Sequence, residues 1–388
     1  MGAWIMIGLL AADIILQLSG LGGNVQWDWH EMGKRISYRM FQTAVDQANP
    51  AAAYHMRRTH KLIRSEYVPS PEDLEAVAEE NSAALLEDMA GENSEAVRAA
   101  EAESKTNTAE SETGTEYVET LAGVPTGEIY SEKALMDPDF LLEHFYIVDE
   151  TTSMTKQDLN GTKLVTMDLS AKLGKEEPLV LIYHTHGSET YKKVNGKEGS
   201  VIEVGTALTK ELENVYGIKT VHDKSVYDMV DGQLDRNAAY NFAGDSVEAA
   251  LRKNPSVKVV IDLHRDSVEN NIHLRTKING KSAAQIMFFN GVSRLASKGD
   301  IGYLYNPNKE ANLAFSLQMQ LLCGKYYPDL TRRIYIKGYR YNLHLAKRAM
   351  LVEVGAQNNT VEEAKNAMKP LAEMLYRLLS GEKSYKKN

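Results

Sequence analysis

A histidine and a glutamate stand three residues apart where an apolar stretch of the chain ends. They are His186 and Glu189, in the run Leu179-Val-Leu-Ile-Tyr-His-Thr-His-Gly-Ser-Glu189. Neutral imidazole and carboxylate oxygen both bind Zn²⁺ well, and a catalytic zinc needs three protein ligands and an open position for water. The pattern indicates a zinc hydrolase, although the H-x-x-E spacing alone also arises often by chance.

Two other apolar runs carry polar side chains that fit the same site. His264 closes the run that begins at Val257, and Glu353 lies inside the apolar run 350–354. A carboxylate in an apolar strand is costly unless it is paired, bound to a metal or kept protonated. We predict that His186, Glu189 and His264 bind zinc. Glu353 would take a proton from the attacking water and pass it to the departing amine.

Neighbouring residues compete for roles at this site. His184 and His186 share one face if the strand continues, so both compete for the metal. The H-x-x-E spacing favours His186 and leaves His184 to support a ligand or contact the substrate. Arg265 either pairs with Asp266 to orient His264 or holds a substrate carboxylate.

Two further segments carry candidate site residues. Asn342 and His344 lie in the run Tyr339-Arg-Tyr-Asn-Leu-His344, whose mix of polar and aromatic residues suits a cleft wall. We predict that both bind substrate. His222 and Asp223 end another strand and either line the same rim or, for the histidine, form a hydrogen bond in the core.

The elements that must position these residues alternate between strand and helix. The predicted strands are residues 179–183, 219–222, 257–263, 284–289, 333–336 and 349–354. The predicted helices are residues 201–215, 237–253, 309–322 and 361–379. Several strands are continuous apolar runs, as buried parallel strands require. We predict an α/β catalytic domain over residues 171–384, with a mixed, mostly parallel sheet flanked by helices and a site beyond the carboxyl ends of its strands.

The composition is that of an ordinary globular protein. Of the 388 residues, 43% are hydrophobic and 25% are charged. The net charge of -9 argues against a nucleic-acid-binding surface, which is usually basic. The single cysteine, Cys323, excludes a disulfide within the chain, and its helical, apolar setting favours a buried thiol over a nucleophile.

The N-terminal third differs from the rest of the chain. Residues 4–21 are almost wholly apolar, and about 18 such residues approach the length that spans a bilayer. We predict a single N-terminal membrane anchor over residues 1–23, with the rest of the chain outside the cytoplasm. A cleaved signal is the alternative, and a buried helix is the third interpretation. A juxtamembrane helical region (24–68), an acidic disordered linker (69–134) and a lead-in segment (135–170) would follow.

Several motifs together resemble a known family. They are Tyr183-His-Thr-His-Gly-Ser-Glu-Thr-Tyr191, Asp262-Leu-His-Arg-Asp266, Tyr341-Asn-Leu-His-Leu345 and Leu351-Val-Glu-Val-Gly-Ala-Gln-Asn-Asn-Thr360. Over about residues 137–379 the chain is similar to the stage II sporulation protein P family of membrane-anchored cell-wall hydrolases from endospore-forming bacteria. The family usually has glutamine where this chain has Leu343.

The resemblance implies the fold and activity of a zinc-dependent N-acetylmuramoyl-L-alanine amidase, related to the metallocarboxypeptidases. It implies zinc on His186, Glu189 and His264, with Glu198 and Glu203 as rivals for the carboxylate ligand, and catalysis by Glu353. It also implies a peptidoglycan substrate, some endopeptidase action, and work with stage II sporulation proteins D and M during engulfment of the forespore. A carboxypeptidase-type zinc metallopeptidase and a catalytically silent wall-binding scaffold are the alternatives.

Overall fold

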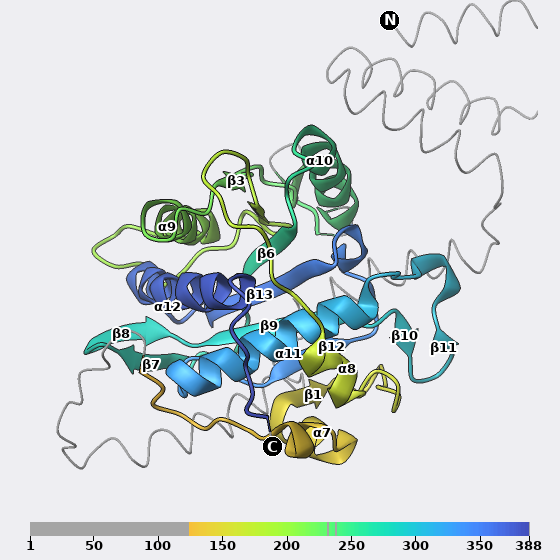
Figure 1. The fold of residues 1–388 in the computed structure, drawn as a ribbon. Coiled ribbons are helices and arrows are strands. Elements are labelled where there is room, and N and C mark those ends of the chain that lie inside the picture. The colour runs from red at the N-terminus through yellow and green to blue at the C-terminus, as the bar shows by residue number, and fades with distance from the viewer. Residues whose placement is uncertain (1–123, 231–232, 237–238, 388) are drawn as a thin grey trace, which may run out of the picture. The chain divides into compact units, whose positions relative to one another are not determined.

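A seven-stranded sheet occupies the centre of the domain, in the order β1-β12-β9-β13-β6-β2-β3 (Figure 1). All neighbouring strands run parallel except β13 and β9, which are antiparallel. This confirms the predicted mixed, mostly parallel sheet. The strands are β1 (Tyr146–Val148), β2 (Val180–Tyr183), β3 (Thr220–His222), β6 (Val259–Asp266), β9 (Ile286–Gly291), β12 (Ile334–Lys337) and β13 (Arg348–Ala356).

The computed structural model of the protein describes residues 124–230, 233–236 and 239–387. Within these ranges no helix has both the length and the apolar character needed to cross a bilayer. The predicted anchor (1–23), the juxtamembrane region (24–68) and most of the predicted linker lie outside the described residues.

Helices cover both faces of the sheet. The main core lies between the sheet and α9 (Val201–Asn214), α11 (Lys309–Tyr326) and α12 (Val361–Leu379), and a second core lies between the sheet and α10 (Ala239–Lys253). The predicted buried thiol, Cys323, is fully buried in the main core. The sheet is therefore apolar on both faces, which explains the continuous hydrophobic runs of its strands.

The alternation of side chains along β6 decides where polar groups lie. Ile261 and Leu263 pack into the main core, and Val260 packs toward α10. Since successive side chains point to opposite faces, Asp262 and His264 share the α10 face with Val260. The polar end of β6 thus lies on one face of the sheet.

The segment predicted as a lead-in, residues 135–170, is part of this domain. Its strand β1 pairs with β12, and its helix α8 (Gly161–Thr166) packs on α11. Tyr335 of β12 also donates a hydrogen bond to Asp149, just beyond β1 (2.6 Å). The domain therefore begins before residue 171. A strand of three residues is too short to reveal itself by periodicity, which is why the sequence prediction started later.

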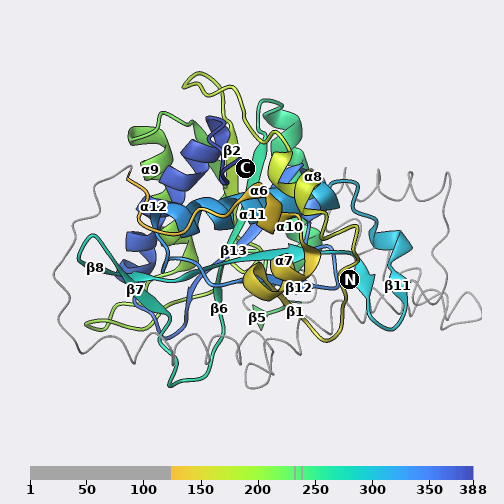
Figure 2. The same ribbon diagram turned by 60° about the horizontal axis from the view of Figure 1, so that its bottom comes forward.

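Smaller elements surround the sheet. The helices α6 (Glu132–Leu135) and α7 (Pro138–Phe145) precede β1. A hairpin of β7 (Arg275–Ile278) and β8 (Lys281–Ala284) lies beside α12 (Figure 2). The short hairpins are β4 (Met229–Val230) with β5 (Gln233–Leu234) and β10 (Arg294–Leu295) with β11 (Gly299–Asp300), and the 3₁₀ helices are η1 (Gly302–Leu304) and η2 (Leu343–Leu345).

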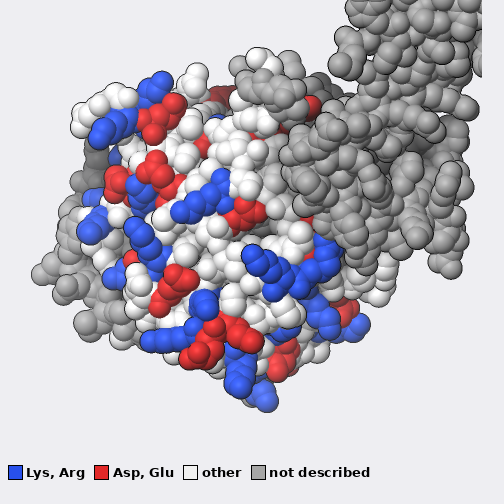
Figure 3. Space-filling model, turned by 90° about the horizontal axis from the view of Figure 1, so that it is seen from above, with Lys and Arg blue, Asp and Glu red and all other residues white. Residues whose placement is uncertain are grey.

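Acidic and basic side chains are interspersed on the described surface that Figure 3 shows. Some of the ion pairs join separate helices, as Lys365 of α12 and Glu203 of α9 do at 3.0 Å. Such exposed pairs contribute little to stability individually. On this face the acidic side chains therefore do not form a single acidic patch.

A network of hydrogen bonds fixes the start of α12. Thr360 Oγ1 accepts a hydrogen bond from the Glu363 N–H (3.2 Å), and the Glu363 carboxylate accepts one from the Thr360 N–H (2.9 Å). Ser282 of β8 and His273 also donate to Glu363, each at 2.9 Å. Burial alone would raise the pKa of Glu363, but the hydrogen bonds from His273, Thr360 and Ser282 outweigh it and lower the pKa to about 2.

This lowered pKa predicts how stability depends on pH. Because the pKa of Glu363 falls from 4.5 to about 2 on folding, the carboxylate stabilises the fold fully above about pH 4.5 and progressively less toward pH 2. Glu363→Gln should lower the free energy of unfolding at pH 7 by about 1–3 kcal/mol, and by less at pH 3. Urea unfolding at both values measures this. Glu362→Gln, at an exposed position, is the control, and a loss that is the same at both pH values would contradict the prediction.

The close approach of the backbones at Gly291 and Tyr339 leads to a second prediction. A Cβ at Gly291, the last residue of β9, would lie 2.0 Å from the carbonyl oxygen of Tyr339. Gly291→Ala should therefore destabilise the protein by about 1–3 kcal/mol in urea unfolding, since the segment that leads to Tyr341 must shift. Gly302→Ala is the matched control, because no heavy atom lies within 4 Å of its Cβ position. Equal stability of the two variants would show that the Tyr339 segment adapts freely.

Candidate metal centre

Three potential metal ligands meet at the carboxyl ends of β2 and β6. Each of His186, Glu189 and His264 offers one ligand atom, and these atoms all lie within 4.8 Å of one another. Glu189 Oε1 is 3.5 Å from His186 Nδ1, and Glu189 Oε2 is 3.7 Å from His264 Nδ1. The structure thus brings together the three side chains that the sequence analysis assigned to a metal, and the donor set is one that zinc uses in catalytic sites.

The turn after β2 presents two of these residues. The Glu189 N–H donates to the His186 carbonyl oxygen (3.1 Å), which closes a tight turn. Between them, Ser188 donates from its N–H (3.1 Å) and its Oγ (2.5 Å) to the fully buried carboxylate of Asp228. Asp228 therefore fixes the turn from a distant part of the sequence.

The Glu189 carboxylate is buried and surrounded by donors. Oε2 accepts a hydrogen bond from the Arg265 N–H (3.0 Å), and Oε1 lies 3.4 Å from Arg236 Nη1. Burial alone would raise the pKa of Glu189, but hydrogen bonds and charge from His186 and His264 hold it well below its usual value. The carboxylate is therefore ionised, which is the form that binds a cation.

Asp262 orients the ring of His264. Its Oδ1 is 2.8 Å from His264 Nε2, and its two oxygens accept hydrogen bonds from the N–H (2.9 Å) and Oγ1 (2.6 Å) of Thr185. With Nε2 beside Asp262, His264 turns Nδ1 toward Glu189. A carboxylate behind a ligating histidine is the usual arrangement that fixes its tautomer and orientation.

Glu353 stands next to this cluster on β13. In the parallel ladder it is paired in register with His264 of β6. The residue is partly exposed, but its Oε2 is buried and has no hydrogen-bond partner among the described residues. Burial raises the pKa of Glu353 well above its usual value, while the charge of His264 lowers it and that of Asp266 raises it. A carboxyl with a raised pKa beside a metal-type cluster is suited to general acid/base chemistry.

The sequence matches one protein family over most of its length. The family model described as Stage II sporulation protein P matches residues 43–376 of the 388. The chain belongs to the stage II sporulation protein P family. Stage II sporulation protein P of Bacillus subtilis (strain 168) is 27% identical over 215 residues, which are 51% of this chain and 50% of that protein. The chain thus spans about half the length of this curated relative.

Solved structures with a related arrangement are more distant. The N-acetylmuramyl-L-alanine amidase Ami1 from Mycobacterium smegmatis is 12% identical, covers 54% of this chain and 100% of its own, and gives a TM-score of 0.33. The N-acetylmuramoyl-L-alanine amidase from Clostridium difficile 630 is 17% identical, covers 52% and 95%, and gives 0.31. A metallo-carboxypeptidase from Burkholderia cenocepacia is 9% identical, covers 55% and 59%, and gives 0.28. Values this low carry no functional argument, so the family assignment rests on sequence.

In this stage II sporulation protein P homologue, Glu189 and neither of its rivals joins the two histidines. Glu198 accepts a hydrogen bond from Thr190 Oγ1 (3.0 Å). Glu203 caps α9 and contacts Lys365 of α12 (3.0 Å). Both side chains are substantially exposed and serve the surface around α9.

His184 lies in the interior and is not one of the three clustered ligands. It is fully buried, its Nδ1 donates to the Leu263 carbonyl oxygen (2.7 Å), and its Nε2 is 2.9 Å from His222 Nε2. Both rings pack on Gly205 of α9, where a Cβ would come within 2.7 Å of each. His184 has no exposed atom to offer a substrate, so the predicted substrate contact is wrong. For His222 the core hydrogen bond is the interpretation that the structure favours.

Arg265 and Asp266 do not form the ion pair that the sequence suggested. The Asp266 carboxylate pairs with Arg332 (2.5 Å), while the Arg265 side chain donates to the carbonyl oxygens of Thr190 (2.9 Å) and Asp266 (3.2 Å). Successive strand side chains point to opposite faces, so these two cannot pair within β6. Arg265 contributes to the cluster through its backbone N–H to Glu189.

Asn342 and His344 lie beside the segment that backs the cluster. Asn342 Nδ2 donates to the Tyr240 carbonyl oxygen (2.7 Å), and the Tyr240 ring is 5.6 Å from the His186 ring. His344 accepts a hydrogen bond from Asn308 Nδ2 at its carbonyl oxygen (2.7 Å). Through this hydrogen bond Asn342 supports the start of α10. The predicted substrate contacts of Asn342 and His344 stay predictions.

Sequence reasoning missed three residues that build the site. Asp262 precedes His264 by two, so strand alternation could have placed both on one face. Asp228 and Arg236 come from the irregular segment between β3 and α10, which carries no periodic signal. Arg236 Nη1 is 3.3 Å from His186 Nδ1, and the side chain is only 8% exposed.

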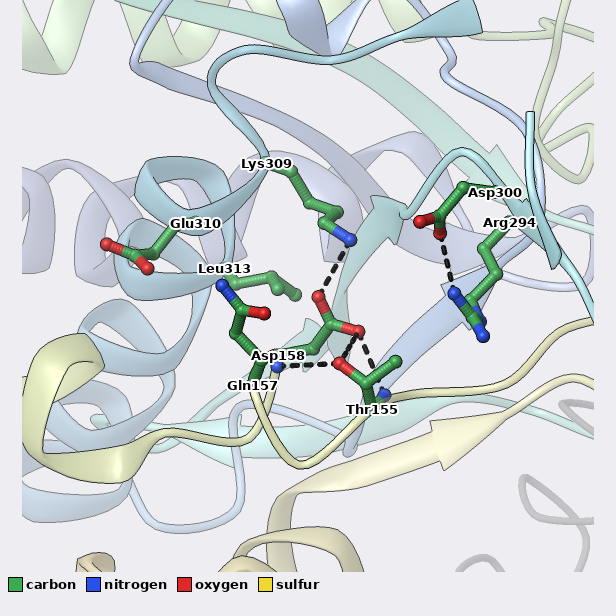
Figure 4. Close-up of a pocket in the computed structure, with 8 residues that line it drawn as sticks. All are labelled: Thr155, Gln157, Asp158, Arg294, Asp300, Lys309, Glu310 and Leu313. Carbon is green, nitrogen blue, oxygen red and sulfur yellow. Dashed lines mark hydrogen bonds and ion pairs between the residues drawn. The ribbon is translucent and has the colours of Figure 1, made fainter. Parts of the chain in front are cut away.

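A separate cavity of about 270 Å³ is lined by other residues (Figure 4). Lys309 is 2.8 Å from Asp158, and Arg294 is 2.7 Å from Asp300. Because these charges satisfy one another across the cavity, its lining does not call for a charged ligand. We assign it no role in the site.

The cluster yields a prediction about metal content. His186→Ala or His264→Ala should remove most of the zinc that the purified protein retains, because each leaves two ligands where three are needed. Elemental analysis after dialysis measures the loss, and circular dichroism checks the fold. His144→Ala, on the exposed side of α7, should keep its zinc.

A paired comparison tests the carboxylate. Glu189→Ala should lose zinc and Glu203→Ala should not. The reverse result would move the ligand to α9.

Proposed function

We propose that the chain is a zinc-dependent N-acetylmuramoyl-L-alanine amidase that hydrolyses peptidoglycan during forespore engulfment. It would cleave the amide between the lactyl group of the glycan and the stem peptide. The observation that carries the proposal is the cluster of His186, Glu189 and His264 with Glu353 beside it on the neighbouring strand. Membership of the stage II sporulation protein P family supports the same reaction.

A divalent cation fits the residues that are present. Two imidazoles and an ionised carboxylate face a common region, and the buried Glu353 Oε2 next to them has no partner within the described chain. His186, Glu189 and His264 would hold the ion. Bound there, zinc would supply Lewis-acid chemistry toward the scissile carbonyl.

The chain's own residues would manage the proton. Glu353 would accept a proton from the attacking water and deliver it to the nitrogen of the departing amine, which is otherwise a poor leaving group. To accept that proton Glu353 must first be ionised, and the charge of a bound cation beside it would favour the ionised form. Asp262 would keep His264 in one orientation throughout.

The carboxypeptidase alternative loses its candidate residue. That reaction needs a guanidinium to bind the free carboxylate of a substrate, and Arg265 was the residue to check. Its Nε and Nη1 donate to the carbonyl oxygens of Thr190 and Asp266. Arg265 is therefore engaged with the backbone, and the preference for the amidase rests on membership of the family.

The proposal extends to location and partners. The apolar run at residues 4–21 favours anchoring at the cell membrane with the catalytic domain outside the cytoplasm. Stage II sporulation proteins D and M are the partners that the family resemblance leads us to expect.

Glu353→Gln tests the catalytic assignment. The variant keeps the shape of the side chain and cannot exchange the proton, so it should release fragments from purified sacculi about 10²–10⁴-fold more slowly. Its zinc content and its urea unfolding should match those of the unmodified protein. Glu248→Gln, on the exposed side of α10, is the control. Full hydrolysis by Glu353→Gln would refute the assignment of Glu353, and no hydrolysis even by the unmodified protein would favour a wall-binding scaffold.

Mass spectrometry of the released fragments identifies the bond that is cut. An amidase releases stem peptides with a free N-terminal alanine and leaves glycan strands intact. Cleaved cross-links with peptides still attached to the glycan would indicate endopeptidase action instead.

A further inference from the structure

The side chain of Arg236 reaches into the cluster of metal-type ligands. Its Nη1 lies 3.3 Å from His186 Nδ1 and 3.4 Å from Glu189 Oε1. The arginine is 7% exposed, so its charge is largely removed from water. A buried guanidinium thus touches two of the three groups that would hold the ion.

The surrounding backbone holds this arginine against the turn that carries the ligands. The Asp235 N–H, next to Arg236, donates to the Asp228 carbonyl oxygen (2.8 Å), and the Asp228 carboxylate accepts both hydrogen bonds from Ser188. One residue therefore links the Arg236 segment to the turn between His186 and Glu189. These hydrogen bonds hold the segment that carries Arg236 beside the turn that carries His186 and Glu189.

The Arg236 guanidinium and a metal ion would compete for the same place. Its Nη1 lies 3.3 Å from His186 Nδ1 and 3.4 Å from Glu189 Oε1, and arginine stays positively charged in proteins. A cation held by the same two side chains would lie close to this charge and be repelled by it. The bound ion and the Arg236 contacts therefore disfavour each other.

We propose that Arg236 is a positioning residue that stands in for the cation in the metal-free protein. It would hold His186 and Glu189 together and neutralise the buried carboxylate until a metal ion displaces it. This inference rests on the proposed metal centre. It adds that Arg236 and the metal ion compete for His186 and Glu189. Because the ion and the Arg236 guanidinium repel each other, Arg236 lowers the affinity for metal while it preserves the geometry of the site.

The affinity for Zn²⁺ tests the proposal. Arg236→Gln in the full chain should bind Zn²⁺ about 10- to 100-fold more tightly than the unmodified protein, which is the equivalent of one hydrogen bond to a charged group. Competition with a chromophoric zinc chelator measures the Kd without any need for activity. Arg236→Lys, which keeps the charge but loses the fork of donors, should fall between the two. Arg252→Gln, at an exposed pair on α10, should not change the Kd.

Thermal unfolding gives a second readout that separates the metal-free protein from the metal-bound one. Metal-free Arg236→Gln should have a lower Tm than the metal-free unmodified protein, because Glu189 loses a cationic neighbour. Saturation with Zn²⁺ should raise the Tm of the variant by more, since a tighter ligand stabilises the folded state more.

A purely structural arginine predicts a different pattern. Its removal would lower the Tm in both states and leave the Kd unchanged or weaker, and that result in a folded variant would overturn the role of Arg236 alone. If neither the variant nor the unmodified protein binds Zn²⁺, the metal centre and this inference both fail.

Discussion

The burial of one negative charge, on Glu189, constrains everything around the site. A carboxylate removed from water costs several kcal/mol unless charged or hydrogen-bonding partners compensate it. The compensation here comes from separate elements: the backbone of Arg265 at the end of β6, the rings of His186 and His264, and the guanidinium of Arg236. These elements must therefore be in place together, which ties the geometry of the cluster to the folding of the domain.

The parallel arrangement of the central strands makes that meeting possible. Tyr183 of β2 is in register with Asp262 of β6, and His264 is in register with Glu353 of β13. Groups that are far apart in the sequence therefore lie close together at one edge of the sheet. The strand register fixes Glu353 beside His264 and leaves it little freedom to move away from that residue.

The sequence predicts most of the fold, and it predicts those site residues that follow regular elements. His186, His264 and Glu353 could be found because each lies in or directly after an apolar run. The shared face of His184 and His186 depended on β2 continuing, whereas the strand ends at Tyr183 and the chain turns. Arg236 and the partner of Asp266 could not be found, because an irregular segment and a long-range ion pair leave no periodic trace.

The place of β1 at the rim of the sheet has a mechanical consequence. Before it reaches this edge, the described chain contacts Lys325 and Lys386 through residues 126–132, and β12 and β9 separate β1 from β13 and the site. A load applied through the preceding residues would act on those contacts first and then on the three-residue β1, which it would peel away from β12. The two intervening strands would shield the ligand-bearing strands from that strain, so pulling on the N-terminal side should loosen the rim before it distorts the chemistry.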